Sequence, residues 1–242
     1  MAFDTPEGSF QMAAAAERGT LEGGLDASGL RYGGTTDNIT MTISGSEIPL
    51  PQVTLGMAQM GGLYQMPVIP GEEPQDFALV LRINGLEIDN MSWTIFDAMG
   101  ALPRDPATLV IDLSGTAIMS EDFTSPEFAE SDMGEMPGQL ESLDINALEL
   151  SLAGAELTGS GAFTFNNDTE EPVPAGTARL LLVGGNTLLD TLVGMGLLPE
   201  EQAMGARMML GLFARPDGED TLVSDIEVTE DGQVLANGQR IR

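Results

Sequence analysis

A ten-residue pattern of apolar and polar positions recurs along the chain: apolar, any, apolar, any, apolar, small, Gly, any, any, apolar. Its clear copies are ITMTISGSEI from Ile39, LVLRINGLEI from Leu79, LVIDLSGTAI from Leu109 and LELSLAGAEL from Leu148, and GGLDASGLRY from Gly23 is a weaker copy. Alternation with a period of two is typical of a β-strand that buries one face. The chain is therefore predicted to be built from one repeated kind of strand.

The last apolar position of the pattern has the opposite parity to the first three. A β-bulge at the glycine would turn that residue back to the apolar side. Alternatively, the glycine opens a turn and the last residue begins the next strand. We expect a mainly β fold with a single coiled, bulged antiparallel sheet, and residues 1–242 as one elongated β-rich domain without a repeat period regular enough for a propeller.

Several further segments are predicted from local signals. The alanine-rich segment from Phe10 to Arg18 fits either a helix or a frayed strand. Val53 to Val68 is predicted as a strand broken at Gly61 and Gly62. Ser92 to Met99 is predicted as a short helical segment, with Ser92 as its N-cap.

A C-terminal helical hairpin is predicted between Asn186 and Ala214. Asn186 is placed as the cap of its first helix, and Pro199 at the first position of its second helix. A strand from Thr221 to Thr229 and a last short strand are expected to follow.

Composition narrows the classes of function. The formal net charge is −29, and the chain contains no Cys, no His and no Lys. This charge disfavours nucleic acids and anionic lipid surfaces as partners. A long acidic loop is predicted over residues 120–141. No apolar run is long enough for a transmembrane helix, and the first residues, MAFDTPEGSF, lack the regions of a signal peptide.

The same composition limits the available chemistry. Without His and Cys the usual zinc and haem ligands are missing, so no metal site and no cofactor are expected. Paired carboxylates could serve a hydrolase, but the chain has one Trp and two Tyr to form a sugar platform. The acidic clusters Glu219–Asp220 and Glu230–Asp231 are interpreted as solvated turns, and no catalytic residue is assigned.

Methionine is frequent, with 15 residues. It usually fills irregular cores or adaptable apolar surfaces. If the sheet forms an apolar groove, we expect Met204, Met208 and Leu212 to be its helical wall.

Several stretches resemble the DUF2125 family of bacterial proteins, a domain of unknown function. They are LRYGG from Leu30, LPRDPATLVIDLSG from Leu102, SLDINALELSLAGAELTG from Ser142, and GLLPEEQAMGARMMLGLFA from Gly196 with NGQR after it. The resemblance, from about residue 20 to the end, implies an exported envelope protein of the periplasm of which this chain is the C-terminal part. The β-rich pattern is also similar to that of AsmA-like envelope proteins, which are associated with lipid handling.

These observations lead to three functional hypotheses. The first is a non-enzymatic envelope protein that binds a lipid or another apolar ligand in a curved-sheet groove. The second is an adaptor that binds another envelope protein through an exposed sheet edge. The third is a carboxylate-dependent hydrolase.

Overall fold

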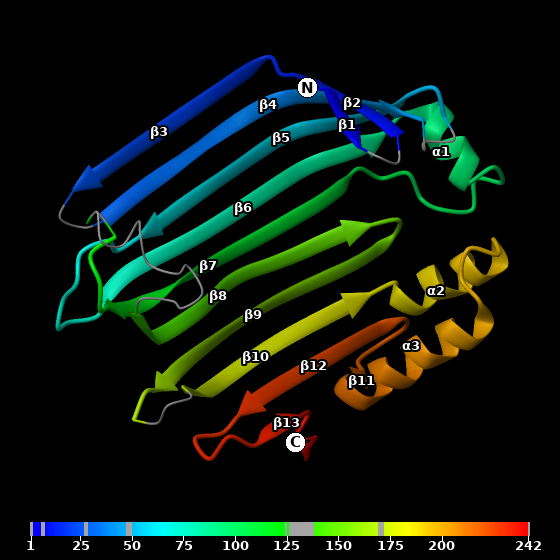
Figure 1. The fold of residues 1–242 in the computed structure, drawn as a ribbon. Helices are drawn as coiled ribbons and strands as arrows, with labels where there is room; N and C mark the ends of the chain where they lie inside the picture. Colours follow the sequence, from blue (N-terminus) through cyan, green and yellow to red (C-terminus); the bar gives the residue numbers. More distant parts are fainter. Residues whose placement is uncertain are drawn as a thin grey trace.

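The computed structural model of the chain describes residues 2–5, 8–26, 29–46, 50–123, 125, 138–168 and 172–241. Its main feature is one large antiparallel sheet that is not closed, with three short helices at one end of the strands (Figure 1). The predicted fold class is confirmed, including the C-terminal helical hairpin.

The strands are β1 (Ala2–Thr5), β2 (Gly8–Ala15), β3 (Arg18–Asp26), β4 (Gly29–Gly45), β5 (Val53–Met66), β6 (Gln75–Ile88), β7 (Ala107–Met119), β8 (Gly138–Leu152), β9 (Ala155–Asn166), β10 (Val173–Val183), β11 (Arg215–Pro216), β12 (Thr221–Val228), β13 (Val234–Ala236) and β14 (Gln239–Arg240). The helices are α1 (Asn90–Phe96), α2 (Gly185–Gly194) and α3 (Glu200–Phe213).

The sheet is a meander in which most strands pair with their neighbours in sequence. Its order is β1-β2-β4-β5-β6-β7-β8-β9-β10-β12-β13-β14, with β3 paired to β4 and β11 paired to β12. The long strand β4 pairs with β3 along one half and with β2 along the other half. One border of the sheet is therefore formed by β3 along one half and by β2 with β1 along the other half. The opposite border is formed by β11, β13 and β14.

The two sides of the sheet differ in polarity. Directly paired residues of antiparallel strands lie on the same side, and the register places Tyr32, Tyr64, Leu79 and Leu113 in one row across four strands. We call this side the apolar face and the opposite side the polar face. By register, the apolar face also carries Leu30, Met60, Leu81, Ile111, Leu148, Leu150, Leu157 and Leu182.

In three neighbouring strands, the alternation of side chains between the two faces shifts by one residue at the same level of the sheet. Asn38, Ala58 and Gly85 lie in register across β4, β5 and β6, and Asn38 and Gly85 have positive φ values of 51° and 66°. The register between β6 and β7 shifts at this level, between Ile83 and Leu86. The bulge returns Leu86 and Ile88 to the apolar face. Ile88 is the last apolar residue of this copy of the repeat, so the bulge alternative is confirmed here.

The other repeat glycines have different roles. Gly154 (φ 83°) belongs to the turn that precedes β9, as the alternative predicted, whereas Gly29 (φ 115°) is the first residue of β4. Gly115 lies inside β7, and the irregular registers there arise on β8, which carries extra residues at Glu141 and Asn146. The pattern therefore predicts apolar strand positions, while the role of its glycine depends on the neighbouring strand.

Some local predictions need correction. Of the two alternatives for the segment from Phe10, the strand is confirmed, because Phe10 to Ala15 lie in β2. The predicted break at Gly61 and Gly62 is wrong, because β5 runs unbroken through both residues. The N-cap of α1 is Asp89 instead of Ser92, because the Asp89 carboxylate accepts the backbone N–H groups of Met91 and Ser92.

Two predicted boundaries also change. The N-cap of α2 is Gly184 rather than Asn186, since the backbone N–H of Asn186 donates to the Asp220 carboxylate. The acidic loop predicted over residues 120–141 ends by Gly138, where β8 begins. Within that loop, residue 124 and residues 126–137 lie outside the described residues.

The molecule exposes much more surface than a compact protein of its mass. Its accessible area is 15433 Å², whereas a compact monomer of 25.5 kDa exposes about 10,400 Å². The fully buried core is correspondingly small; among the described side chains it includes Val223 and Ala203. The excess area indicates that much of the single sheet layer is covered on neither side.

Candidate functional site

The hairpin of α2 and α3 covers one end of the apolar face and forms with it a cavity of about 540 Å³ that is open to solvent on one side. Binding pockets for small molecules span a similar range of volumes. The strand side of the cavity comes from β8, β9 and β10, and its roof from the two helices. Its lining consists of uncharged residues: Leu150, Leu152, Ala155, Leu157, Leu182, Gly185, Leu188, Leu189, Leu192, Ala206, Met209, Leu210 and Phe213.

Two polar side chains hold this hairpin over the sheet. The Asp220 carboxylate accepts the backbone N–H groups of Asn186 and Thr187 at 2.9 Å each, which satisfies donors at the first turn of α2. The hydroxyl of Ser224 on β12 donates to the carbonyl of Phe213 at the end of α3, at 2.6 Å. Both helices are thereby anchored to the same strand region, and Asp220 lies in the acidic cluster that was interpreted as a solvated turn.

Beyond the hairpin, the apolar face continues without a helical cover. Met60, Tyr64 and Leu79 are 43%, 41% and 43% exposed, and Leu150 in the cavity lining is 41% exposed. Apolar residues of this size are usually buried, and a contiguous exposed patch marks a binding or interaction surface. The cavity and the open rows together form one apolar surface across several strands.

The predicted groove residues Met204, Met208 and Leu212 lie on α3 but outside the lining of the cavity. Their side chains are 65%, 73% and 55% exposed. The helical wall over the sheet is instead formed by Ala206, Met209, Leu210 and Phe213. Contact of a ligand with the Met204 side of α3 stays a prediction.

The carboxylates with resolved shifts are all held in the ionised form. Hydrogen bonds from the Ser92 hydroxyl and from the backbone N–H groups of Ser92 and Thr54 lower the pKa of Asp89 to about 2. The backbone N–H groups of Leu102 and Ala101 lower the pKa of Asp97.

The same direction holds near the C-terminus. Burial raises the pKa of Asp220, but hydrogen bonds from Thr187 and Asn186 outweigh it and leave this pKa lowered. The side chains of Thr229 and Gln233 lower the pKa of Asp231. A general acid for glycoside hydrolysis needs a raised pKa, so these four groups serve as caps of helices and turns.

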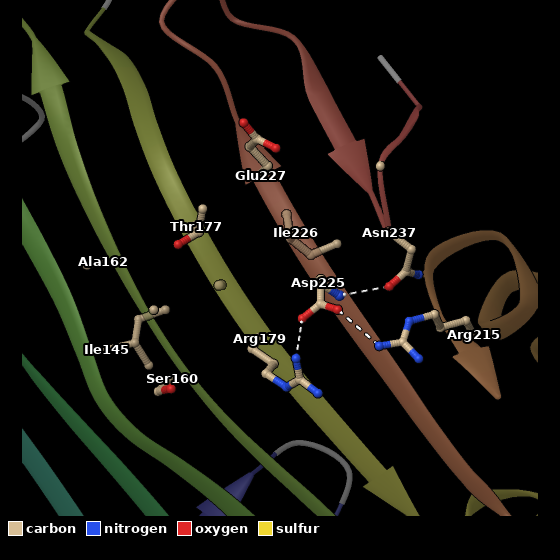
Figure 2. Close-up of a pocket in the computed structure, with 13 residues that line it drawn as sticks. Ile145, Ser160, Ala162, Thr177, Arg179, Arg215, Asp225, Ile226, Glu227 and Asn237 are labelled. Atoms are coloured by element: carbon tan, nitrogen blue, oxygen red, sulfur yellow. Dashed lines mark hydrogen bonds and ion pairs between the residues drawn. The ribbon is translucent and has the colours of Figure 1, made fainter. Parts of the chain in front are cut away.

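A second hollow lies over β10 and β12, has a volume of about 710 Å³ and holds an ion network (Figure 2). Asp225 pairs with Arg179 at 2.9 Å and with Arg215 at 3.4 Å, and Arg215 also pairs with Asp217 at 3.2 Å. The side-chain amide of Asn237 accepts the backbone N–H of Asp225 and donates to the carbonyl of Phe213, at 3.0 Å each.

These pairs tie β10, β11 and β12 together at the C-terminal border of the sheet. Their side chains are 42–60% exposed, and such pairs contribute little stability, roughly 0.2–1 kcal/mol each. Two guanidinium groups already neutralise the charge of Asp225. We therefore interpret the network as holding the strands of this border together.

Across the ranges that the structure describes, no three acidic side chains gather closely enough to hold a metal ion. None of the helices in these ranges combines the length and the apolar character of a membrane span.

Comparison with known families agrees with the resemblance found in the sequence. The profile of a family described as "Uncharacterized protein conserved in bacteria (DUF2125)" matches residues 5–240. The chain belongs to the DUF2125 family. No curated protein and no solved structure matches this DUF2125 chain, so the analogy to AsmA-like proteins receives no support. The open apolar face and its helical cover are features that the family description does not mention.

Proposed function

We propose that this DUF2125 chain is a non-enzymatic envelope protein that binds an elongated apolar ligand, such as a lipid acyl chain, on its apolar face and under the α2–α3 hairpin. One observation carries the proposal: the uncharged cavity of about 540 Å³ opens onto rows of half-exposed apolar side chains. Covering such a surface removes apolar area from water, at a gain of roughly 25 cal/mol per Å².

The chemistry of the lining favours a tail over a head group. None of the 13 lining residues of the cavity is charged, so no guanidinium is available there to bind phosphate or carboxylate. The net charge of −29 also repels anionic groups over the surface as a whole. We therefore expect the polar end of a ligand to remain in water while its apolar part lies on the sheet.

The test combines native mass spectrometry of gently purified protein with titration by N-phenylnaphthylamine, a neutral apolar fluorophore. We expect a co-purifying acyl species, or saturable binding of the fluorophore by the stripped protein. Ala206→Trp fills the cavity from the helical side and should weaken binding about tenfold or more, which corresponds to roughly 1.4 kcal/mol.

Met208→Trp is the matched control, because Met208 is 73% exposed on the outer side of α3. It adds the same indole without filling the cavity, so its affinity should equal that of the wild type. Absence of any bound species together with absence of saturable fluorescence would contradict the proposal. Equal loss in both variants would place the binding site on the outer side of α3, at the residues predicted from the sequence.

Location in the periplasm is part of the proposal and is supported by the family resemblance alone. Fractionation of a native host with an antibody against the chain should recover it with periplasmic markers.

The second candidate function, an adaptor that binds another protein through a sheet edge, is favoured by the exposure of β3.

A further inference from the structure

The two borders of the sheet differ in how they are protected. At the C-terminal border, β11, β13 and β14 are two or three residues long, and β11 ends with Pro216. Short strands and proline are common devices against pairing with another chain. Strand β3, at the other border, has nine residues, all of them exposed, and contains no proline.

Strand β3 also lacks a neighbour on its outer side. Within the described part of the chain it pairs with β4 alone, and Figure 1 shows it as the outermost strand of its border. Its outward backbone groups are thus available to a further strand. An edge of this length without protection favours pairing with another β-strand.

The charges on β3 are arranged for self-pairing. Arg18 and Glu22 both point to the polar face, four residues apart, and the structure records no ion pair for either among the described residues. The direct neighbour of Arg18 on β4, Asp37, accepts a hydrogen bond from Gln59 instead. The neighbour of Glu22 on β4 is Gly33, which offers no side chain.

We propose that two copies of the chain pair edge to edge through β3, antiparallel, about a two-fold axis at Thr20. In this register Arg18 lies opposite Glu22 of the second copy, and the symmetry forms this pair twice. Opposite charges in directly paired positions stabilise antiparallel strands. Leu21 lies opposite Gly19 of the second copy, where no side chain obstructs it.

Other registers fit the charges less well. A two-fold axis at Glu22 would pair all nine residues of β3 and set Arg18 opposite Asp26, but Asp26 already has an interaction within its own copy. The same axis would place the two Glu22 carboxylates opposite each other, which is destabilising. An axis at Leu21 would set Arg18 opposite Gly24 and form no direct ion pair. The axis at Thr20 is therefore the register that the side chains favour.

The pairing would join the apolar faces of the two copies. A two-fold axis perpendicular to the sheet keeps the same face on the same side in both copies. Leu21 and Leu25 belong to the apolar face and are 68% and 60% exposed, so they would lie at the junction. The dimer itself does not depend on the proposed ligand. Only the idea that the two joined apolar faces bind one ligand surface together rests on the proposed function.

Sedimentation velocity at about 0.15 M salt tests the dimer, because the Debye length of roughly 8 Å then screens most of the repulsion between two acidic copies. The interface is small, so we expect a dissociation constant in the micromolar range. Arg18→Glu and Glu22→Arg should each raise it about tenfold or more. The double variant Arg18→Glu/Glu22→Arg should restore the wild-type value. Glu121→Arg, an exposed loop substitution with the same charge change as Glu22→Arg, should leave it unchanged.

A cross-linking experiment locates the axis independently. The chain has no cysteine, so a single introduced cysteine can form a disulfide only with the same cysteine of a second copy. Thr20→Cys should form a disulfide-linked dimer on mild oxidation, since residues directly opposite each other have Cβ atoms about 4.5–5.5 Å apart. Glu22→Cys is the matched control on the same strand and face. It should run as a monomer in non-reducing denaturing electrophoresis.

A wild-type chain that stays monomeric at about 100 μM, well above the micromolar dissociation constant that its small interface predicts, would overturn the proposal. So would single variants that dimerise as well as the wild type, a double variant that fails to recover, or cross-linking by Glu22→Cys in place of Thr20→Cys. All of these readouts are made without an apolar ligand, so their failure is distinguishable from failure of the proposed ligand binding.

Discussion

Gly184 shows how a single residue places the helical cover of the apolar face. It lies in the left-handed region, with φ 75°, at the N-cap of α2. A Cβ atom at this position would lie 2.4 Å from the carbonyl oxygen of Gly154 in the β8–β9 turn. The entry of the chain into α2 therefore requires glycine for both its backbone angle and its close approach to that turn.

Gly184→Ala should lower the free energy of unfolding by at least about 2 kcal/mol, because the left-handed conformation and the contact are both unfavourable for alanine. Gly211→Ala is the control on the exposed side of α3, where nothing lies within 4 Å of the added methyl group. That change should raise the stability by roughly 0.5–1 kcal/mol. Urea unfolding monitored by circular dichroism measures both, and equal midpoints for the two variants would refute this explanation.

At the scale of elements, α1 depends on one ionised cap. The pKa of Asp89 is lowered from 3.8 to about 2 by the Ser92 hydroxyl and by backbone N–H groups. A carboxyl group with a lowered pKa in the folded state contributes stability above its unfolded value, and this stability is lost as the pH falls from about 3.8 to about 2. Protonation removes the acceptor that holds the first turn of α1.

Asp89→Asn should therefore be less stable than the wild type at pH 6, and the difference should shrink toward zero as the pH approaches 2. Thermal unfolding between pH 2 and pH 6 provides the comparison. Glu121→Gln is a suitable control, since it removes one negative charge at a residue for which the structure records no hydrogen bond. A stability difference for Asp89→Asn that does not change with pH would contradict the role of ionisation.

The helical wall of the cavity shows how far the sequence could predict the site. The strand side was predictable, because Leu150, Leu152 and Leu157 are apolar positions of the repeat copy that begins at Leu148. On α3, the prediction followed a strict spacing of four residues through Met204, Met208 and Leu212. The less exposed stripe instead follows spacings of three, four and three through Ala203, Ala206, Leu210 and Phe213. These spacings stay closer to the 3.6-residue period of a helix.

Caps and bulges were less predictable, and the reason is their dependence on distant residues. Asn186 has the side chain of a good N-cap, yet the donors of that helix turn are satisfied by Asp220, which lies 34 residues away in sequence. Likewise, the glycine of the repeat forms a bulge in β6 but not in β7, because the neighbouring strand determines where the extra residue lies.

For the whole molecule, the meander means that the stability of each strand depends mainly on the strands next to it. Each interior strand contacts mainly its two neighbours, and few residues are buried between layers. In such a quasi-one-dimensional arrangement the borders open before the middle. The open sheet thus predicts a gradient of stability from its borders to its centre.

Native-state hydrogen exchange should reveal this gradient. Amides of β6, β7 and β8 should exchange most slowly, while those of β3 and β14 should exchange fastest in the isolated copy. Pairing through β3 should slow exchange in that strand as the protein concentration rises, whereas β14 should be unaffected. Uniform protection over the whole sheet would contradict the local picture.

The row of Asn38, Ala58 and Gly85 has a consequence for how this fold tolerates changes of length. Each of the three strands carries one additional residue at the same level, so their mutual registers remain continuous. Deletion of Asn38 alone would turn Ile39, Met41 and Ile43 of β4 toward the polar face and expose the opposite set to the apolar side. Insertions and deletions in β4, β5 and β6 are thus coupled, and homologous chains should gain or lose these residues as a group.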